Sequence, residues 1–208
     1  MQIRSDSFDD GAVIPDAFAF AKPDAENHVA LSTNRNPHLT WSDVPGGTRS
    51  FVLICHDPDV PSRSDDVNQD GREVPVDLPR VDFFHWLLWN IQARTREIAA
   101  GSHSDAVTPR GKSGPDAPGG MRHGVNDYTG WFAGDAEMAG TYFGYDGPAP
   151  PWNDALVHHY VFTLYALDVD HLDVAAEANG AAVRDALVGH VLAQARLIGT
   201  CTLNPRLR

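Results

Sequence analysis

The sequence predicts a mainly β protein, a β-sandwich of largely antiparallel sheets with peripheral and C-terminal α-helices. Three segments rich in β-branched and aromatic residues, 50–57, 83–91 and 158–168, have the length and composition of buried strands. The alternation of strands and helices that marks a parallel nucleotide-binding sheet is missing. Glycine (18) and proline (15) are spread along the chain, which is typical of short elements joined by turns.

One domain is expected over residues 1–208, because 42% hydrophobic content suffices for a normal core at this length. No internal repeat and no low-complexity linker divides the chain. Residues 27–33 and 38–41 are weaker strand candidates. Two long segments, 62–82 and 101–127, are predicted loops, and loops of this length are commonly functional or mobile.

The end of the chain predicts a helix over 181–199. Asn179 and Gly180 can start it, and Gly199 can end it. The spacing places six residues on one stripe: Val183, Ala186, Leu187, His190, Val191 and Gln194.

The acidic composition excludes several classes of partner. A formal charge of −12 repels phosphate backbones and anionic lipid surfaces, so nucleic-acid binding is not expected. The first residues lack the apolar segment of a signal peptide, and the longest apolar stretch is too short to cross a bilayer. Cys55 and Cys201 fit neither a disulfide framework nor a metal-binding pair. We therefore expect a cytoplasmic protein without integral membrane association.

Two histidines lie near the starts of predicted strands. With a period of two, His85 shares a face with Phe83, Leu87, Trp89 and Ile91, and His158 with Tyr160, Phe162, Leu164 and Ala166. A single histidine on an apolar face is more often a satisfied core residue than a ligand. Here two histidines occupy equivalent strand ends, beside an acidic segment at the end of a third strand. This arrangement favours a pocket at one end of the core about as much as it favours two satisfied core histidines.

That acidic segment is "DPDVP", 57–61. Proline cannot continue a central strand, so Pro58 and Pro61 are expected to take the chain out of the sheet and to fix the directions of Asp57 and Asp59. The alternative is a rigid turn with solvated carboxylates. A second turn-rich segment, "YFGYDGPAPPWND" at 142–154, can bring backbone N–H groups close to a ligand or can be a plain connector.

Motifs for cofactors and for common hydrolases are incomplete. "GKS" at 111–113 lacks the earlier glycine and the preceding strand of a phosphate loop. Neither a Gly-x-Ser-x-Gly elbow nor a His-Glu-x-x-His helix occurs. No cofactor is predicted.

Together these segments resemble the phosphatidylethanolamine-binding protein family, also called Raf kinase inhibitor-like proteins, and in particular its bacterial branch. The resemblance covers most of the chain and is carried by "DPDVP", "FFHWLLWNI", "GVNDY" and the Gly-Pro loop leading into "HHYVF". It implies a β-sandwich with a small anion-binding pocket near one end. Carried over residue by residue, it implies eight ligand-binding residues: Asp57, Asp59, Pro61, His85, Gly147, Ala149, His158 and Tyr160.

The sequence departs from the family pattern in three places. His159 stands where the family often has an arginine, which removes a fixed cation. Ala149 replaces a glycine of some members. The loop after Ser62 is longer than in the shortest bacterial members, so it can cover the pocket or a partner surface.

The resemblance implies a non-enzymatic binding protein for phosphate-type anions or phospholipid headgroups, and one that can modulate a signalling kinase or a protease. Two aspartates beside a phosphate would cost on the order of 4 kcal/mol at about 4 Å. Protonated His85 or His158, a protonated Asp57 or backbone N–H groups near Gly147 can offset this, so affinity is expected to rise as pH falls. A zwitterionic headgroup that turns its ammonium toward a carboxylate is another solution.

Two other readings stay open. Two histidines and two aspartates can also ligate a divalent metal, so a metal-assisted hydrolase is the alternative function. Trp131, Phe132 and Trp152 can form a homodimer surface or anchor loops.

Overall fold

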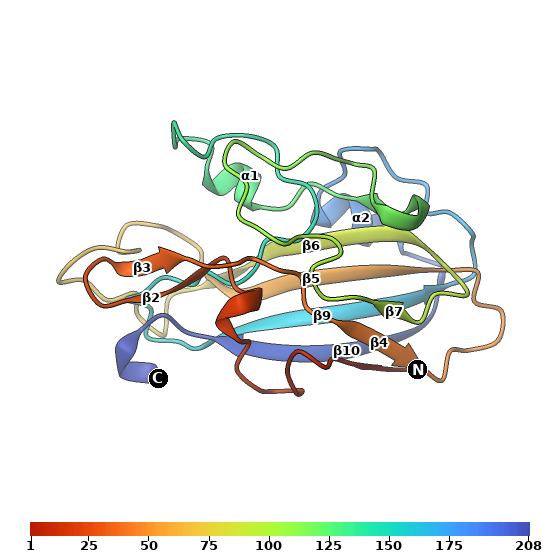
Figure 1. The fold of residues 1–208 in the computed structure, drawn as a ribbon, viewed down its shortest axis with the longest axis horizontal. Coiled ribbons are helices and arrows are strands. Elements are labelled where there is room, and N and C mark those ends of the chain that lie inside the picture. The colour runs from red at the N-terminus through yellow and green to blue at the C-terminus, as the bar shows by residue number, and fades with distance from the viewer.

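A five-stranded antiparallel sheet runs the length of the molecule (Figure 1). The computed structural model describes residues 1–208. The strand order is β10-β9-β5-β6-β8, formed by β5 (Ser50–Pro61), β6 (Arg80–Gln92), β8 (Arg122–His123), β9 (His158–Leu167) and β10 (Val191–Cys201). The strands predicted at 50–57, 83–91 and 158–168 are confirmed as β5, β6 and β9, the centre of this sheet.

A second sheet completes the sandwich. It has the order β1-β4-β7, from β1 (Gln2–Arg4), β4 (Leu39–Ser42) and β7 (Glu97–Ile98). A core of 19 buried side chains, among them Trp41 of the small sheet and Phe51 and Trp86 of the large one, draws on both sheets. The predicted fold class is therefore confirmed.

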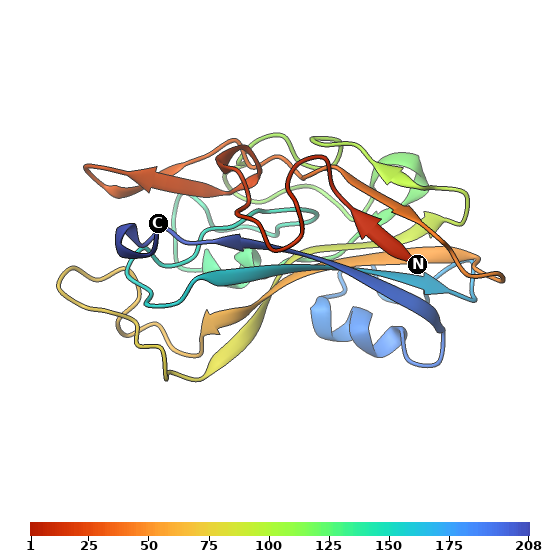
Figure 2. The same ribbon diagram turned by 90° about the horizontal axis from the view of Figure 1, so that it is seen from below.

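The remaining elements cover the sheets. Helix α2 (Gly180–Ala186) lies on the face of the large sheet opposite β1 and β4, over ten further buried side chains (Figure 2). A hairpin of β2 (Ala21–Asp24) and β3 (His28–Leu31) projects near the C-terminus at one end of the molecule. The shorter pieces are α1 (Tyr128–Trp131) and the 3-10 turns Asp16–Phe18, Pro118–Gly120 and Pro205–Leu207. The candidates at 27–33 and 38–41 correspond to β3 and β4.

The predicted helix over 181–199 is wrong in its second half. Helix α2 ends at Ala186, Gly189 takes a positive φ of 86°, and the chain then enters β10. Gly199 lies inside this strand and not at a helix end. The alternate residues Leu197, Gly199 and Cys201 are buried, which is the period of a strand. Val191 and Gln194 of β10 continue the helical stripe of the preceding residues, whereas pairing with β9 decides the structure.

Bulges correct two further details of the strand prediction. The partner of Cys55 is Trp86 and that of His56 is Phe84, so His85 is an extra residue on β6. A second register shift lies between the pairs Leu53–Leu88 and Phe51–Ile91. Leu87 and Trp89 therefore pack under α2, whereas His85 and Ile91 lie on the other face. Pro58 does not take β5 out of the sheet. The strand leaves β9 after His56 but stays paired with β6 as far as Pro61, on the far side of a register shift.

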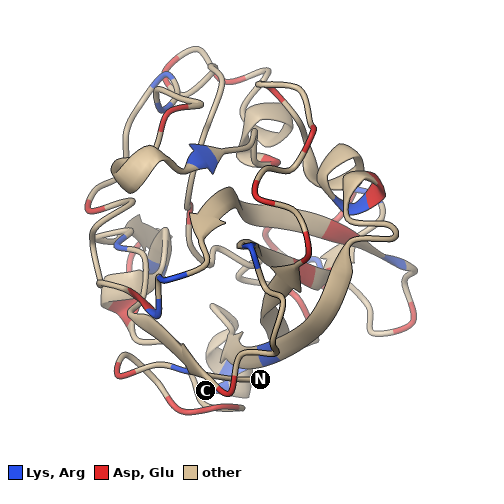
Figure 3. Cartoon of the chain, turned by 90° about the vertical axis from the view of Figure 1, so that its right-hand side faces the viewer, with Lys and Arg blue, Asp and Glu red and all other residues tan.

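Acidic residues are scattered over several loops and strands of the molecule (Figure 3). They outnumber the basic residues by 28 to 16, which gives the formal charge of −12. None of the helices has the length and apolar character needed to cross a membrane.

Candidate functional site

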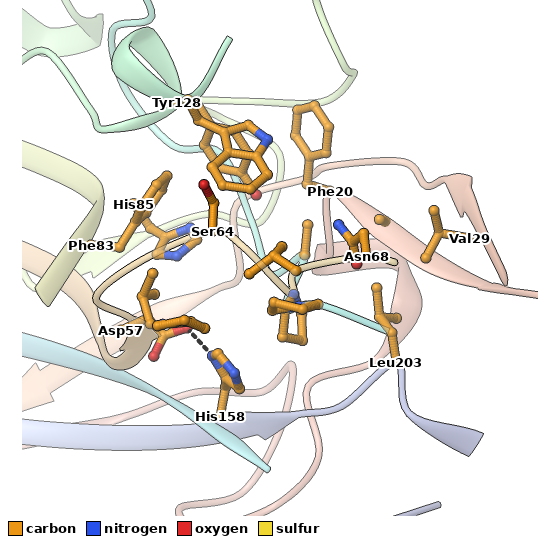
Figure 4. Close-up of a pocket in the computed structure, with 18 of the residues that line it drawn as sticks. Phe20, Val29, Asp57, Ser64, Asn68, Phe83, His85, Tyr128, His158 and Leu203 are labelled. Atoms are coloured by element: carbon orange, nitrogen blue, oxygen red, sulfur yellow. Dashed lines mark hydrogen bonds and ion pairs between the residues drawn. The ribbon is translucent and has the colours of Figure 1, made fainter. Parts of the chain in front are cut away.

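A cavity of about 420 Å³ opens where the β2–β3 hairpin, the 62–79 loop and α1 meet one end of the large sheet. Its lining is divided. Asp57, His85 and His158, here called the polar floor, gather at one end (Figure 4). Hydrophobic side chains line much of the rest, and we call the following group the apolar wall: Phe20, Val29, Leu31, Trp131, Phe132 and Leu203.

The structure brings six of the eight residues implied by the resemblance to this one cavity: Asp57, Pro61, His85, Ala149, His158 and Tyr160. Asp59 and Gly147 do not line it. The Asp59 carboxylate accepts hydrogen bonds from the backbone N–H and the Nδ1 of His159, both at 2.8 Å. The Gly147 N–H donates to Asn34 Oδ1, so it is not available to a ligand. His159, which stands where the family often has arginine, is thereby held by Asp59.

His158 is completely buried between two carboxylates. Its Nδ1 lies 2.7 Å from Asp57 Oδ2 and its Nε2 lies 3.1 Å from Asp154 Oδ2. Both ring nitrogens can donate only in the imidazolium form. Desolvation alone would lower the pKa of His158, but the bonds to Asp154 and Asp57 outweigh it and raise the pKa to about 9. His158 is therefore a cation at neutral pH, and it neutralises Asp57.

Arg80 completes this charged group from β6. Its Nη1 and Nη2 contact Asp154 Oδ2 and Oδ1 at 2.6 and 3.0 Å, a bidentate pair. Asp57, His158, Asp154 and Arg80 together carry two negative and two positive charges. The predicted repulsion between a phosphate and two aspartates is thus removed, because Asp59 faces elsewhere and Asp57 is paired. No protonated Asp57 is needed.

His85 differs in its protonation. Its Nδ1 lies 2.7 Å from the carbonyl oxygen of Asp146, which can only accept, so Nδ1 carries the proton. Desolvation by burial lowers the pKa of His85 to about 4, although Asp57 and nearby carbonyl groups oppose the shift. At neutral pH the ring is uncharged, and Nε2, to which no protein group bonds, is a hydrogen-bond acceptor for whatever occupies the cavity.

A buried polar network holds the 142–154 segment in place. The Asp146 carboxylate accepts from Asn34 Nδ2 at 2.7 Å and from Asn126 Nδ2 at 2.8 Å, and it pairs with Lys112 Nζ at 2.9 Å. Burial raises the pKa of Asp146 and lowers that of Lys112. The backbone of Asp146 bonds twice to His85, through its carbonyl to Nδ1 and through its N–H to the His85 carbonyl at 3.0 Å. This network fixes the orientation of the His85 ring.

The 142–154 segment leaves backbone N–H groups without a protein acceptor, and Ala149 is the one of them that lines the cavity. Pro148, Pro150 and Pro151 have no N–H, and Pro148 uses its carbonyl to accept from Phe20 and Ala21. The N–H of Ala149, which lines the cavity, donates to no other group of the protein. Ala149, whose N–H has no protein acceptor, and His85, whose Nε2 has no protein partner, therefore line the same cavity.

Several functional positions had no signal in the sequence that distinguished them. Arg80 is the first residue of β6 and Asp154 lies in the loop before β9, so only folding brings both of them to His158. The apolar wall comes from four distant segments. Trp131 and Phe132 line the cavity, while Trp152 stacks on His28 with ring centroids 3.8 Å apart. All three rings therefore serve loops or the cavity, and a homodimer surface stays a prediction.

Residues 1–208 contain no cluster of three or more His, Cys, Asp or Glu side chains arranged to hold a metal ion. His158 in particular uses both ring nitrogens in bonds to carboxylates. The donor set gives the alternative of a metal-assisted hydrolase no support.

A family model and several known proteins are similar to this chain over most of its length. The family model described as "Phosphatidylethanolamine-binding protein" matches residues 4–202. The UPF0098 protein YbhB of Escherichia coli is 32% identical over 95% of this chain and 97% of its own length. A UPF0098 protein of Methanothermobacter thermautotrophicus is 33% identical over 96% and 97%.

Solved structures are similar over nearly the whole chain as well. YbcL of Escherichia coli, described as a new member of the mammalian PEBP family, superposes with a TM-score of 0.69 at 26% identity, covering 97% of both chains. A PEBP homologue from Chlamydia trachomatis, CT736, gives a TM-score of 0.63 at 27% identity, covering 96% of this chain and 95% of its own.

Proposed function

Because this chain belongs to the phosphatidylethanolamine-binding protein family, we propose that it is a non-enzymatic binding protein whose cavity takes a phosphate monoester, such as free phosphoethanolamine. The observation that carries the proposal is the pairing of a free acceptor with a free donor. The acceptor is Nε2 of neutral His85, and the donor is the N–H of Ala149. Both residues line the cavity beside the group of Asp57, His158, Asp154 and Arg80, whose charges sum to zero.

This arrangement selects the protonation state of the ligand. A phosphate monoester loses its second proton at about pH 6. The monoanion retains a P–OH that can donate to His85 Nε2, while another phosphoryl oxygen accepts from Ala149. If the proton moves to Nε2 instead, the complex still holds one proton more than the dianion and neutral His85 do separately.

The expected pH dependence follows from this proton count. Affinity should be nearly constant from about pH 5 to about pH 6 and should fall about tenfold per pH unit above that. The titrating proton belongs to the ligand, since His158 keeps its charge and His85 stays neutral over this range. This revises the sequence-based expectation that the histidines themselves titrate there. A ligand of so few atoms should bind with about micromolar affinity or weaker.

Calorimetry with phosphoethanolamine and methyl phosphate over this pH range tests the proposal. Methyl sulfate is the matched ligand, because it is a monoanion without an ionisable proton and should bind weakly at every pH. His85→Asn keeps a donor to the Asp146 carbonyl but removes Nε2, so it should abolish the preference for phosphate. His190→Asn, at an exposed histidine paired with Asp168, is the control and should bind as the wild type does. Absence of binding by both phosphates rejects the proposed function.

A further inference from the structure

The apolar wall gives the cavity a second half that a phosphate group leaves unused. Phe20, Val29 and Leu203 lie on the side away from the polar floor (Figure 4). A volume of about 420 Å³ far exceeds what the few atoms of a phosphate group can fill, since a water molecule in the liquid occupies about 30 Å³. The space beyond the floor is therefore part of the site and has to be filled by ligand or by water.

The wall also reaches the protein surface. Leu31 is 59% exposed and Trp131 is 50% exposed, although both line the cavity. They come from the β2–β3 hairpin and from α1, so they lie at the mouth on two separate elements. Large apolar side chains held in water at the rim of a pocket gain free energy when a ligand covers them.

The polar side chains near the mouth are confined to the 62–79 loop. Asn68 Oδ1 accepts from the Trp152 N–H, and the Asn68 N–H donates to Asn153, so this residue is partly used in holding the loop. The Arg63 side chain is 67% exposed and lies near Asp65. No carboxylate lies in the apolar wall, so an ammonium placed there would lose its hydration without gaining a charged partner.

We propose that the ligand is a phosphate monoester with an apolar substituent, which contacts Phe20, Val29 and Leu203 and emerges between Leu31 and Trp131. The proposal rests on the proposed function for the position of the phosphate. It goes further in assigning specificity to the hydrophobic part. Inorganic phosphate and short headgroups are then weak ligands, and the substituent supplies much of the affinity.

A series of ligands with one headgroup tests this proposal: inorganic, methyl, butyl and hexyl phosphate, titrated by calorimetry at about pH 6, near the ligand's own pKa. Each methylene that becomes buried should raise the affinity up to about fourfold. The gain should stop when the chain passes the mouth. Trp131→Ala should reduce the affinity for hexyl phosphate several-fold and leave that for methyl phosphate unchanged, and Trp131→Phe should restore most of it. Val188→Ala, at a valine that is 79% exposed and lies outside the cavity lining, is the control.

The outcomes separate the two proposals. Equal affinity for all four phosphates overturns the apolar assignment and leaves the proposed function standing. Hexanol binding as tightly as hexyl phosphate supports the apolar wall and rejects the phosphate site. No binding by any ligand overturns both. Sedimentation with vesicles that contain phosphatidic acid, a lipid whose phosphate is a monoester, and displacement by hexyl phosphate would support a membrane lipid as the source, whereas the full affinity series without sedimentation supports a soluble ester.

Discussion

His158 Nδ1 lies 2.7 Å from Asp57 Oδ2, and both side chains are almost completely buried. This contact joins the start of β9 to Asp57, which follows the last residue of β5 that pairs with β9. It places an ion pair with no net charge at the polar floor of the cavity. Asp154 and Arg80 extend the pair on the other side of the ring. The charges at the polar floor are therefore balanced before any ligand enters.

The His158 contact predicts a loss of stability in alkali. The pKa is raised from 6.5 to about 9 in the folded protein, so the stabilisation is complete below pH 6.5 and disappears as pH rises through about 9. The loss should be about 3 kcal/mol. Urea unfolding at a series of pH values measures it. His158→Gln should be less stable throughout and should lose this pH dependence, and an unchanged slope would contradict the assignment.

His85 predicts the opposite dependence in acid. Its pKa is lowered from 6.5 to about 4, so the folded state resists protonation that the unfolded chain accepts. The stabilisation is present above pH 6.5 and is lost as pH falls toward about 4, again by about 3 kcal/mol. Burial also lowers the pKa of His103 to about 4 and that of His123 to about 3, and both add to the acid sensitivity. His85→Asn should partly reduce the dependence of the free energy of unfolding on pH below pH 6.5. His190→Asn should not, and equal slopes in the two variants would count against a neutral His85.

Removal of one partner from the buried pair of Lys112 and Asp146 should destabilise the protein strongly. Asp146→Asn leaves the Lys112 ammonium buried without its charge partner, and such losses are about 3–5 kcal/mol. Adding Lys112→Met should recover part of the loss. Asp116→Asn removes an exposed partner of Arg122 and should cost less than about 1 kcal/mol. Thermal and urea unfolding of these three variants and of the wild type gives the comparison. Equal effects of the Asp146 and Asp116 changes would contradict a structural role for this network.

Gly147 is predicted to act through packing and not through ligand contact. A Cβ at this position would lie 2.3 Å from the carbonyl oxygen of Phe18, and backbone cannot easily move away. Gly147→Ala should lower the free energy of unfolding by about 1–3 kcal/mol or more. Gly134→Ala meets no atom within 4 Å and serves as the control. A Gly147→Ala protein of normal stability that fails to bind phosphoethanolamine would instead restore the direct role that the family resemblance implies.

The sequence predicted the fold because its central strands are continuous apolar runs, a signal that does not depend on distant contacts. It mistook β10 for a helix because Val191 and Gln194 continue the helical spacing of residues 183–190, and only pairing with β9 decides against a helix. His85 could be named from its motif. Its place on a bulge could not, since a bulge depends on the register of two strands. The effect of Pro58 and Pro61 was mispredicted for the same reason. They are tolerated in β5 because this part of the strand pairs with β6 alone, which the sequence does not show.

The protonation of the floor was also beyond the sequence. His158 and His85 are the same residue type at similar strand positions, yet one is a cation and the other is neutral. The difference comes from Asp57 and Asp154 on one side and a carbonyl group on the other. Arg80 and Asp154 are 74 residues apart, and no local pattern connects them.

The central claim is that neutral His85 accepts, at Nε2, a hydrogen bond or the proton itself from the ligand. Nitrogen NMR of the labelled His85 ring, followed while phosphoethanolamine is added at about pH 6, tests it most directly. We expect the free protein to show an unprotonated Nε2 and a protonated Nδ1, and the Nε2 resonance to shift strongly toward a protonated or hydrogen-bonded value at saturation. An Nε2 resonance that does not move while calorimetry shows bound ligand would contradict the account.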